Sequence, residues 1–218
     1  MSAFLRTLCV LLSTSALYGF TLGSAHDWIY ASRNLVKFPL LIAGTAVICS
    51  LCYSVIARFL CPQLTFRPVQ MLSIQMFRDL SVLLASLSAP NLFLAMILVH
   101  RDDGKLGEYS LFLGLNVGFI AVSGTLALCR QANALLSRHG VTRARSRAVV
   151  LLWLGMSLVV GGQGAFYLRP LFGLPASRGQ VPPWTLGTAA DVRGATNFFE
   201  VVVQIFRNPP LPKSWGGR

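Results

Sequence analysis

The sequence predicts an all-α fold, a polytopic transmembrane helical bundle of about five spans followed by a C-terminal amphipathic helix. Composition gives the first reason: hydrophobic residues make up 54% of the chain, charged residues only 12%, and the mean hydropathy is +0.62. A soluble domain carries about 25% charged residues. The second reason is a series of apolar runs, each close to the ~20 residues that cross a bilayer as a helix.

We divide the chain into a transmembrane bundle, residues 1–173, and a tail, residues 174–218, with an interfacial helix near 197–207. The net charge of +12 would suggest nucleic acid as a partner in a soluble protein. Here the basic residues lie between apolar runs. We therefore expect them to set the topology and to meet anionic lipid headgroups, with no nucleic acid involved.

The first apolar run covers residues 4–22 and is interpreted as a membrane helix. A basic residue before a short apolar core also resembles a cleavable signal peptide. The second run covers residues 40–60, and Pro39 is expected in the first turn of its helix, where a proline loses no needed N–H donor. Cys49 and Cys52 have the C-x-x-C spacing, but inside an apolar helix they are expected to act as small hydrophobic residues.

The third helical stretch begins at Arg67 and is too long for one span. We expect an interfacial entry that becomes a span at about 80–99. Pro90 and Asn91 lie in the middle of that span, and a proline there removes a backbone hydrogen bond and should kink the helix. Two interpretations stay open: a purely structural kink, or a functional one as a hinge or a cavity lining.

The fourth run, residues 109–128, contains Gly114 and Gly118 with Asn116 between them. Glycines four residues apart form a flat helix face that allows close packing, and an asparagine amide can hydrogen-bond to another helix. The pattern is common in membrane helices, so it supports helix packing and not chemistry.

The fifth run covers residues 149–168 and follows the most basic segment, 130–147, which carries five arginines and no acidic residue. The positive-inside rule places this segment in the cytoplasm, where it would meet anionic lipids. Five spans then put the N-terminus inside and the tail outside. Inside segments would carry nine of the 19 basic residues, so the rule is not met globally. Either the first helix is poorly inserted or the tail returns to the inner face.

The end of the fifth run combines an amide, an arginine and a proline. Gln163 lies deep in the run among small residues and needs a partner. Arg169 follows the run directly, and Pro170 ends the helix. Arg169 either pairs with Glu200 or a lipid phosphate and holds the tail to the bundle, or it simply snorkels at the boundary.

The tail is predicted to contain one helix, which begins at Asn197 as its N-cap with Glu200 three residues on. Residues 198–207 are mostly apolar with one polar stripe, which is typical of a helix that lies in the interface or packs back on the bundle.

The sequence offers few candidate catalytic groups. The three histidines are isolated from one another, and no acidic residue lies at the centre of a span. No nucleophile elbow, zinc-protease or phosphate-loop motif is present. We therefore expect neither an enzyme nor a metal site or other cofactor.

Several segments together resemble a known pattern: residues 33–41, Pro90, residues 109–117, and above all residues 162–173 with 197–200. They resemble a scattered group of uncharacterised bacterial inner-membrane proteins whose last span ends in an aromatic-x-Leu-Arg-Pro-Phe-x-Gly motif. The architecture is similar to that of the five-helix Yip-family membrane proteins. The motif residues here are Tyr167, Arg169, Pro170 and Gly173, and Tyr167 and Leu171 depart from the expected tryptophan and phenylalanine. The resemblance implies the fold and a bacterial inner membrane, and no known activity.

The functional expectation is a non-catalytic integral membrane subunit or scaffold of a larger membrane assembly, whose partners are other membrane protein subunits. The alternative is a small transporter or lipid-handling protein. In that case Asn91, Asn116 and Gln163 would line a polar cavity at mid-depth in the membrane.

Overall fold

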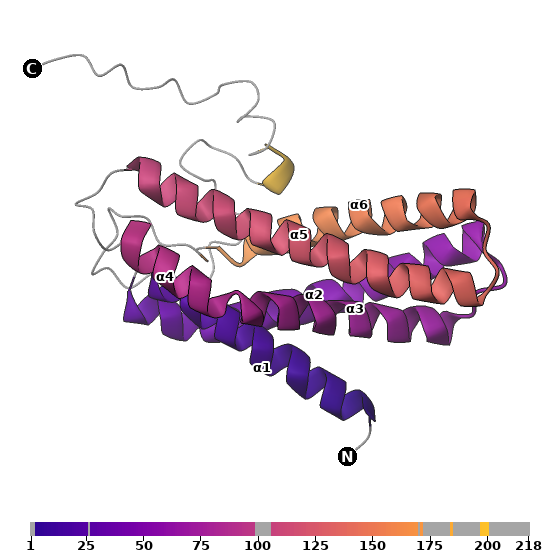
Figure 1. The fold of residues 1–218 in the computed structure, drawn as a ribbon, viewed down its shortest axis with the longest axis horizontal. Coiled ribbons are helices and arrows are strands. Elements are labelled where there is room, and N and C mark those ends of the chain that lie inside the picture. Colours follow the sequence, from indigo (N-terminus) through magenta and orange to yellow (C-terminus); the bar gives the residue numbers. More distant parts are fainter. Residues whose placement is uncertain are drawn as a thin grey trace, which may run out of the picture.

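The computed structural model describes residues 3–25, 27–98, 106–169, 171, 184 and 197–200. These residues form helices and no strands, which confirms the all-α prediction. The helices are, in chain order, α1 (Ala3–Ser24), α2 (Trp28–Leu60), α3 (Phe66–Ser86), α4 (Ser88–Leu98), α5 (Leu106–Arg138) and α6 (Arg143–Tyr167). They lie roughly along one axis in an elongated bundle, with α1 crossing it at an angle (Figure 1).

Within the described residues, four helices are long and apolar enough to span a membrane: α1, α2, α5 and α6. A fifth candidate is the pair α3 and α4, if the two count as one span that bends by 49°. The bundle core is built mainly by α2, where Tyr53 stacks on Trp153 of α6 with ring centroids 4.9 Å apart. Both side chains are fully buried, and large aromatic rings contribute much of the packing energy of a core.

The second helix begins earlier than expected. Asp27 is its N-cap and its carboxylate accepts a hydrogen bond from the N–H of Trp28, so α2 starts at Trp28 and not near Leu40. Pro39 therefore lies inside α2, and the prediction that it opens the helix was wrong. The helix continues through Pro39 because that residue is buried against the bundle, whose packing compensates for one lost hydrogen bond.

The expected interfacial entry before residue 80 is also corrected. Helix α3 is packed among α1, α2 and α5, and its buried side chains include Val69, Met76 and Phe77. A helix that lay in the membrane surface would keep one face in the headgroups. Because α3 buries residues along its whole length, it is a central element of the bundle.

The basic segment 130–147 is helical over most of its length and not a loop. Helix α5 runs to Arg138, and α6 starts at Arg143. The turn between them uses Gly140, whose φ of 64° is a left-handed conformation that glycine adopts without strain. The N–H of Val141 bonds to the carbonyl of Leu136, as in a Schellman C-cap.

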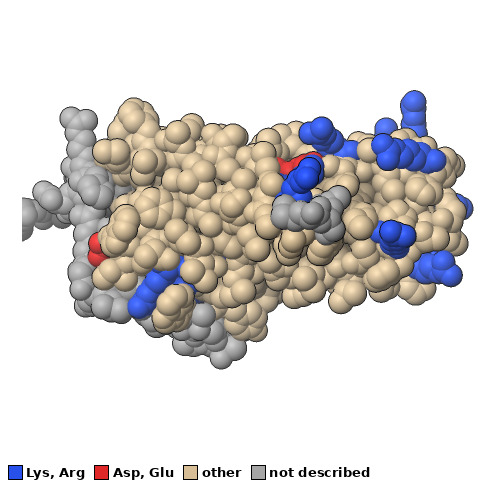
Figure 2. Space-filling view, turned by 90° about the horizontal axis from the view of Figure 1, so that it is seen from below, with Lys and Arg blue, Asp and Glu red and all other residues tan. Residues whose placement is uncertain are grey.

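One end of the bundle is basic (Figure 2). This end holds the α2–α3 and α5–α6 turns (Figure 1). Burial raises the pKa of the Cys61 thiol after α2, and the charge of Arg145 at the start of α6 partly offsets that rise, so the two turns are neighbours. The exposed arginines of this half of the bundle are Arg58, Arg67, Arg130, Arg138, Arg143, Arg145 and Arg147.

Candidate functional site

Asn116 of α5 bonds to another helix. Its Oδ1 accepts a 2.7 Å hydrogen bond from the hydroxyl of Tyr18 on α1, and its Nδ2 donates to the carbonyl of Phe112. Asn116 and Tyr18 are both fully buried. Both polar groups of the amide are thus satisfied, and the contact ties α1 to α5.

Gly114 and Gly118 do not pack against another helix of the described chain. A Cβ atom built on either glycine meets nothing within 4 Å. The reason lies in helix geometry: at about 100° per residue, positions two apart are about 200° apart around the axis. Because Asn116 turns inward to Tyr18, the two glycines turn outward. The expected glycine packing face is therefore an outer face of the bundle.

The third span does break near Pro90, but the bend lies three residues earlier. Helix α3 ends at Ser86 and α4 starts at Ser88, with a 49° bend. Pro90 has no N–H to give to the carbonyl of Ser86, four residues back, and its ring crowds that carbonyl. The N–H of Asn91 resumes the helical pattern by bonding to the carbonyl of Leu87.

Asn91 is fully buried and points to α1. Its Nδ2 donates a 3.4 Å hydrogen bond to Oγ1 of Thr21, one helical turn beyond Tyr18. Its Oδ1 has no hydrogen-bond partner within the described part of the chain, and neither has the hydroxyl of the buried Ser88. Two polar atoms with unmet hydrogen-bonding capacity therefore lie at the bend.

The side chain of Gln163 contacts the tail and does not lie with the amides of Asn91 and Asn116. Its Oε1 accepts a 3.3 Å hydrogen bond from the backbone N–H of Phe198. Helix α6 packs on α2 and α5, whereas Asn91 and Asn116 both bond to α1. A single polar cavity lined by Asn91, Asn116 and Gln163 is thus not what the described residues form, because the three amides face different neighbours.

The tail contact at Gln163 includes a close ring contact. A Cβ atom on Gly162 would lie only 2.7 Å from the ring of Phe198, so the missing side chain makes room for that ring. Asn197 caps the following helical turn, since its Oδ1 accepts from the N–H of Glu200 at 3.0 Å. The expected continuation to residue 207 lies outside the described residues.

Arg169 lies at the end of α6 with its guanidinium carbon 3.7 Å from the ring centre of Phe166, a cation–π contact. Tyr167 is partly exposed, at 42%. Pro170 and Gly173 lie outside the described residues. The chain after α6 is held by α2, because Nδ2 of the buried Asn34 donates a 2.6 Å hydrogen bond to the carbonyl of Leu171.

A second contact from α2 reaches farther into the tail. The guanidinium of Arg33 lies 5.1 Å from the ring centre of Trp184. Together, Arg33, Asn34 and Gln163 hold three separate points of the chain after α6 against one end of the bundle. Arg33 and Asn34 fall in the segment that the sequence pattern singled out, but their partners are more than 130 residues away and have no local signal.

Sequence reasoning missed a second pair of glycines with the same spacing. A Cβ atom on Gly19 would lie 2.5 Å from the carbonyl oxygen of Asn34, and one on Gly23 would lie 2.5 Å from that of Tyr30. At these glycines the backbones of α1 and α2 lie close together. The G-x-x-x-G spacing at 19–23 was the available signal.

A charged group inside the bundle was also missed. The carboxylate of Asp79 on α3 receives hydrogen bonds from Arg78, at 2.6 Å, and from Nε2 of Gln131 on α5, at 2.5 Å. Its side chain is only 13% exposed. A carboxylate in this setting is stabilised by such charge-assisted bonds.

The described residues contain no group of three or more His, Cys, Asp or Glu side chains that could hold a metal ion. Cys49 is buried and Cys52 is partly buried, and both are free thiols.

The helices and their apolar surfaces define a multi-pass helical membrane protein. In comparisons with known proteins, no family model, no curated protein and no solved structure matches the chain.

Proposed function

We propose that the chain is a non-catalytic integral membrane subunit or scaffold of a larger membrane protein assembly. The observation that carries this proposal is the outer face of α5. Gly114 and Gly118 leave a shallow strip there that no described part of the chain fills, and exposed Leu111, Val117 and Val122 surround it. In a membrane, such small residues let a second helix approach closely and gain van der Waals contact.

The proposed location is the inner membrane of a bacterium, with the basic end of the bundle in the cytoplasm. The resemblance in sequence supports the membrane, and the positive-inside rule supports the orientation. The five arginines within 130–147 are all exposed, so anionic lipid headgroups are the proposed partners of this end.

A second candidate, a small transporter or lipid-handling protein, is favoured by a different observation. The buried Oδ1 of Asn91 and hydroxyl of Ser88 lie at a bent span without a partner among the described residues. Buried polar groups are normally hydrogen-bonded to protein or water. A water or a polar ligand at the bend would satisfy both atoms.

The test is purification from native membranes in a gentle detergent, with mass spectrometry of the proteins and small molecules that co-elute. A stoichiometric partner that binds the wild type and is lost from a Gly114→Leu/Gly118→Leu double variant supports the proposal. Gly155→Leu on α6 is the matched control, because its Cβ also meets nothing within 4 Å. A lone protein that carries a defined small molecule would favour the second candidate instead.

A further inference from the structure

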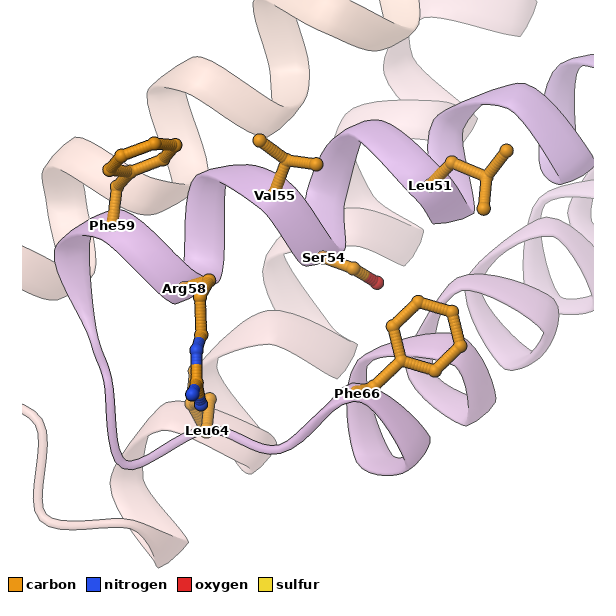
Figure 3. Close-up of a pocket in the computed structure, with 7 residues that line it drawn as sticks. All are labelled: Leu51, Ser54, Val55, Arg58, Phe59, Leu64 and Phe66. Carbon is orange, nitrogen blue, oxygen red and sulfur yellow. The ribbon is translucent and has the colours of Figure 1, made fainter.

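An apolar groove lies on the outer surface at the basic end of the bundle, between the end of α2 and the start of α3 (Figure 3). Its volume is about 430 Å³. Val55 and Phe59 of α2 and Phe66 of α3 are exposed at 57%, 82% and 60%. The residues that line it are Leu51, Ser54, Val55, Arg58, Phe59, Leu64 and Phe66.

The floor of the groove does not require a polar ligand. Ser54, its polar residue besides Arg58, donates to the carbonyl of Ser50 at 2.8 Å and accepts from Nε2 of Gln70 at 3.1 Å. The hydroxyl is already satisfied within the protein, so an apolar chain can lie over it without leaving a hydrogen bond unmade.

Arg58 lies at the end of the groove nearest the α2–α3 turn (Figure 3). Its guanidinium donates one long hydrogen bond, 3.5 Å, to the carbonyl of Pro62. A guanidinium has five N–H donors in a fixed fork, which suits bidentate binding of a phosphate. No acidic side chain of the described chain forms an ion pair with Arg58.

The surroundings favour an anion. Arg67 at the start of α3 is exposed. Arg145 at the start of α6 lies near Cys61, which belongs to the α2–α3 turn beside the groove. Of the acidic residues whose side chains are described, Asp79 is bonded to Arg78 and Gln131, and Asp27 and Glu200 lie toward the opposite end. The positive charge at the mouth of the groove is thus not neutralised locally.

We propose that this groove binds one anionic phospholipid, with an acyl chain against Leu51, Val55 and Phe66 and the phosphate on Arg58. The apolar and charged groups of the groove lie in the same order as those of a lipid in its leaflet. The apolar residues extend about 10 Å along α2 toward the middle of the span, and the charged Arg58 lies at the end of α2. A transmembrane helix of a partner protein would place apolar side chains against Arg58, which fits the charge less well.

The experiment uses the full-length protein, purified in detergent and stripped of lipid. Native mass spectrometry follows the binding of phosphatidylglycerol and of phosphatidylcholine with the same acyl chains. Both headgroups offer a phosphate to Arg58, but phosphatidylcholine also carries a quaternary ammonium group that the guanidinium and the neighbouring arginines repel. We therefore expect phosphatidylglycerol to bind about tenfold more tightly. Arg58→Gln should abolish that preference.

Two further variants separate the parts of the site. Val55→Trp fills the groove from an exposed position and should weaken both lipids. Arg138→Gln, at an exposed arginine on the same half of the bundle that does not line the groove, should keep the preference. All variants must elute from a size-exclusion column at the volume of the wild type and give the same circular dichroism spectrum.

Three results would overturn the inference: equal binding of the two lipids by the wild type, an equal loss in Arg58→Gln and Arg138→Gln, or a dimer that Val55→Trp splits. Equal binding of the two lipids would mean that lipids coat the surface without selection. An equal loss in the two arginine variants would mean that the preference comes from the overall charge of this end and not from Arg58. The third means that a second copy of the chain fills the groove.

Discussion

The hydroxyl of Tyr18 on α1 donates a 2.7 Å hydrogen bond to Oδ1 of Asn116 on α5, and this bond joins two residues that are 98 positions apart in the sequence. One turn further along α1, Thr21 accepts from Asn91 of α4. The first helix is thereby fixed against α4 and α5 by polar contacts at the core of the bundle. A loosely attached first helix is hard to reconcile with this arrangement.

Tyr18→Phe should destabilise the protein by about 1 kcal/mol, because interhelical hydrogen bonds in membranes are worth roughly that much or less. At this chain length the melting temperature should fall by about 2–4 °C. Thermal unfolding in detergent measures it. Tyr167→Phe, at a partly exposed site, is the control and should leave the melting temperature unchanged. An equal loss in both variants would mean that the Tyr18 hydroxyl contributes nothing specific.

Gly19→Ala should destabilise the bundle, because the new methyl group would lie 2.5 Å from the carbonyl oxygen of Asn34 and 2.6 Å from Cβ of Phe38. Overpacking of this kind costs about 1–3 kcal/mol. Gly118→Ala has the same chemistry in open space and should be neutral or stabilising, since alanine is the better helix former. A loss of thermal stability in Gly19→Ala but not in Gly118→Ala would support the packing, and an equal loss in both would contradict it.

The two G-x-x-x-G pairs show what the sequence could and could not predict. Apolar runs of span length predicted the helical membrane fold, because burying backbone in lipid leaves few alternatives to helices. The same spacing at Gly19 and Gly114 could not reveal which pair meets a neighbouring helix. That depends on rotation about the helix axis, which is set by distant contacts such as that between Tyr18 and Asn116.

Some helix boundaries followed from the ends of the apolar runs, as at Leu60 for α2, and others depended on whether a local cap was recognised. Asn197 was identified as a cap and does accept from Glu200. Asp27 was not, so the start of α2 was placed about a dozen residues late, at Pro39. The docking of the chain after α6 on Gln163 and Asn34 rests on contacts between residues far apart, and no pattern in the sequence contains them.

Gln131→Leu should weaken the link between α3 and α5, because the carboxylate of Asp79 would lose its donor from α5. The expected cost is about 1 kcal/mol or somewhat more, since the lost hydrogen bond has a charged acceptor. Gln75→Leu, at an exposed position on α3, is the matched control. If the two variants unfold at the same temperature, the bond to Asp79 does not stabilise the bundle.

Gly162→Leu should release the tail from the last helix. The ring of Phe198 would lie 2.7 Å from the first new carbon atom, and moving the ring also pulls the Phe198 N–H away from Oε1 of Gln163. Brief trypsin digestion of the detergent-purified protein measures the release, because Arg193 precedes this contact in the chain. We expect cleavage at Arg193 to become several-fold faster.

Gly155→Leu on the same helix gains equal helix propensity without touching Phe198, and it should be cleaved like the wild type. Restoration of the slow rate in a Gly162→Leu/Phe198→Ala double variant would locate the effect in the clash, whereas equal cleavage of all four proteins would show that the tail is not held at Gly162.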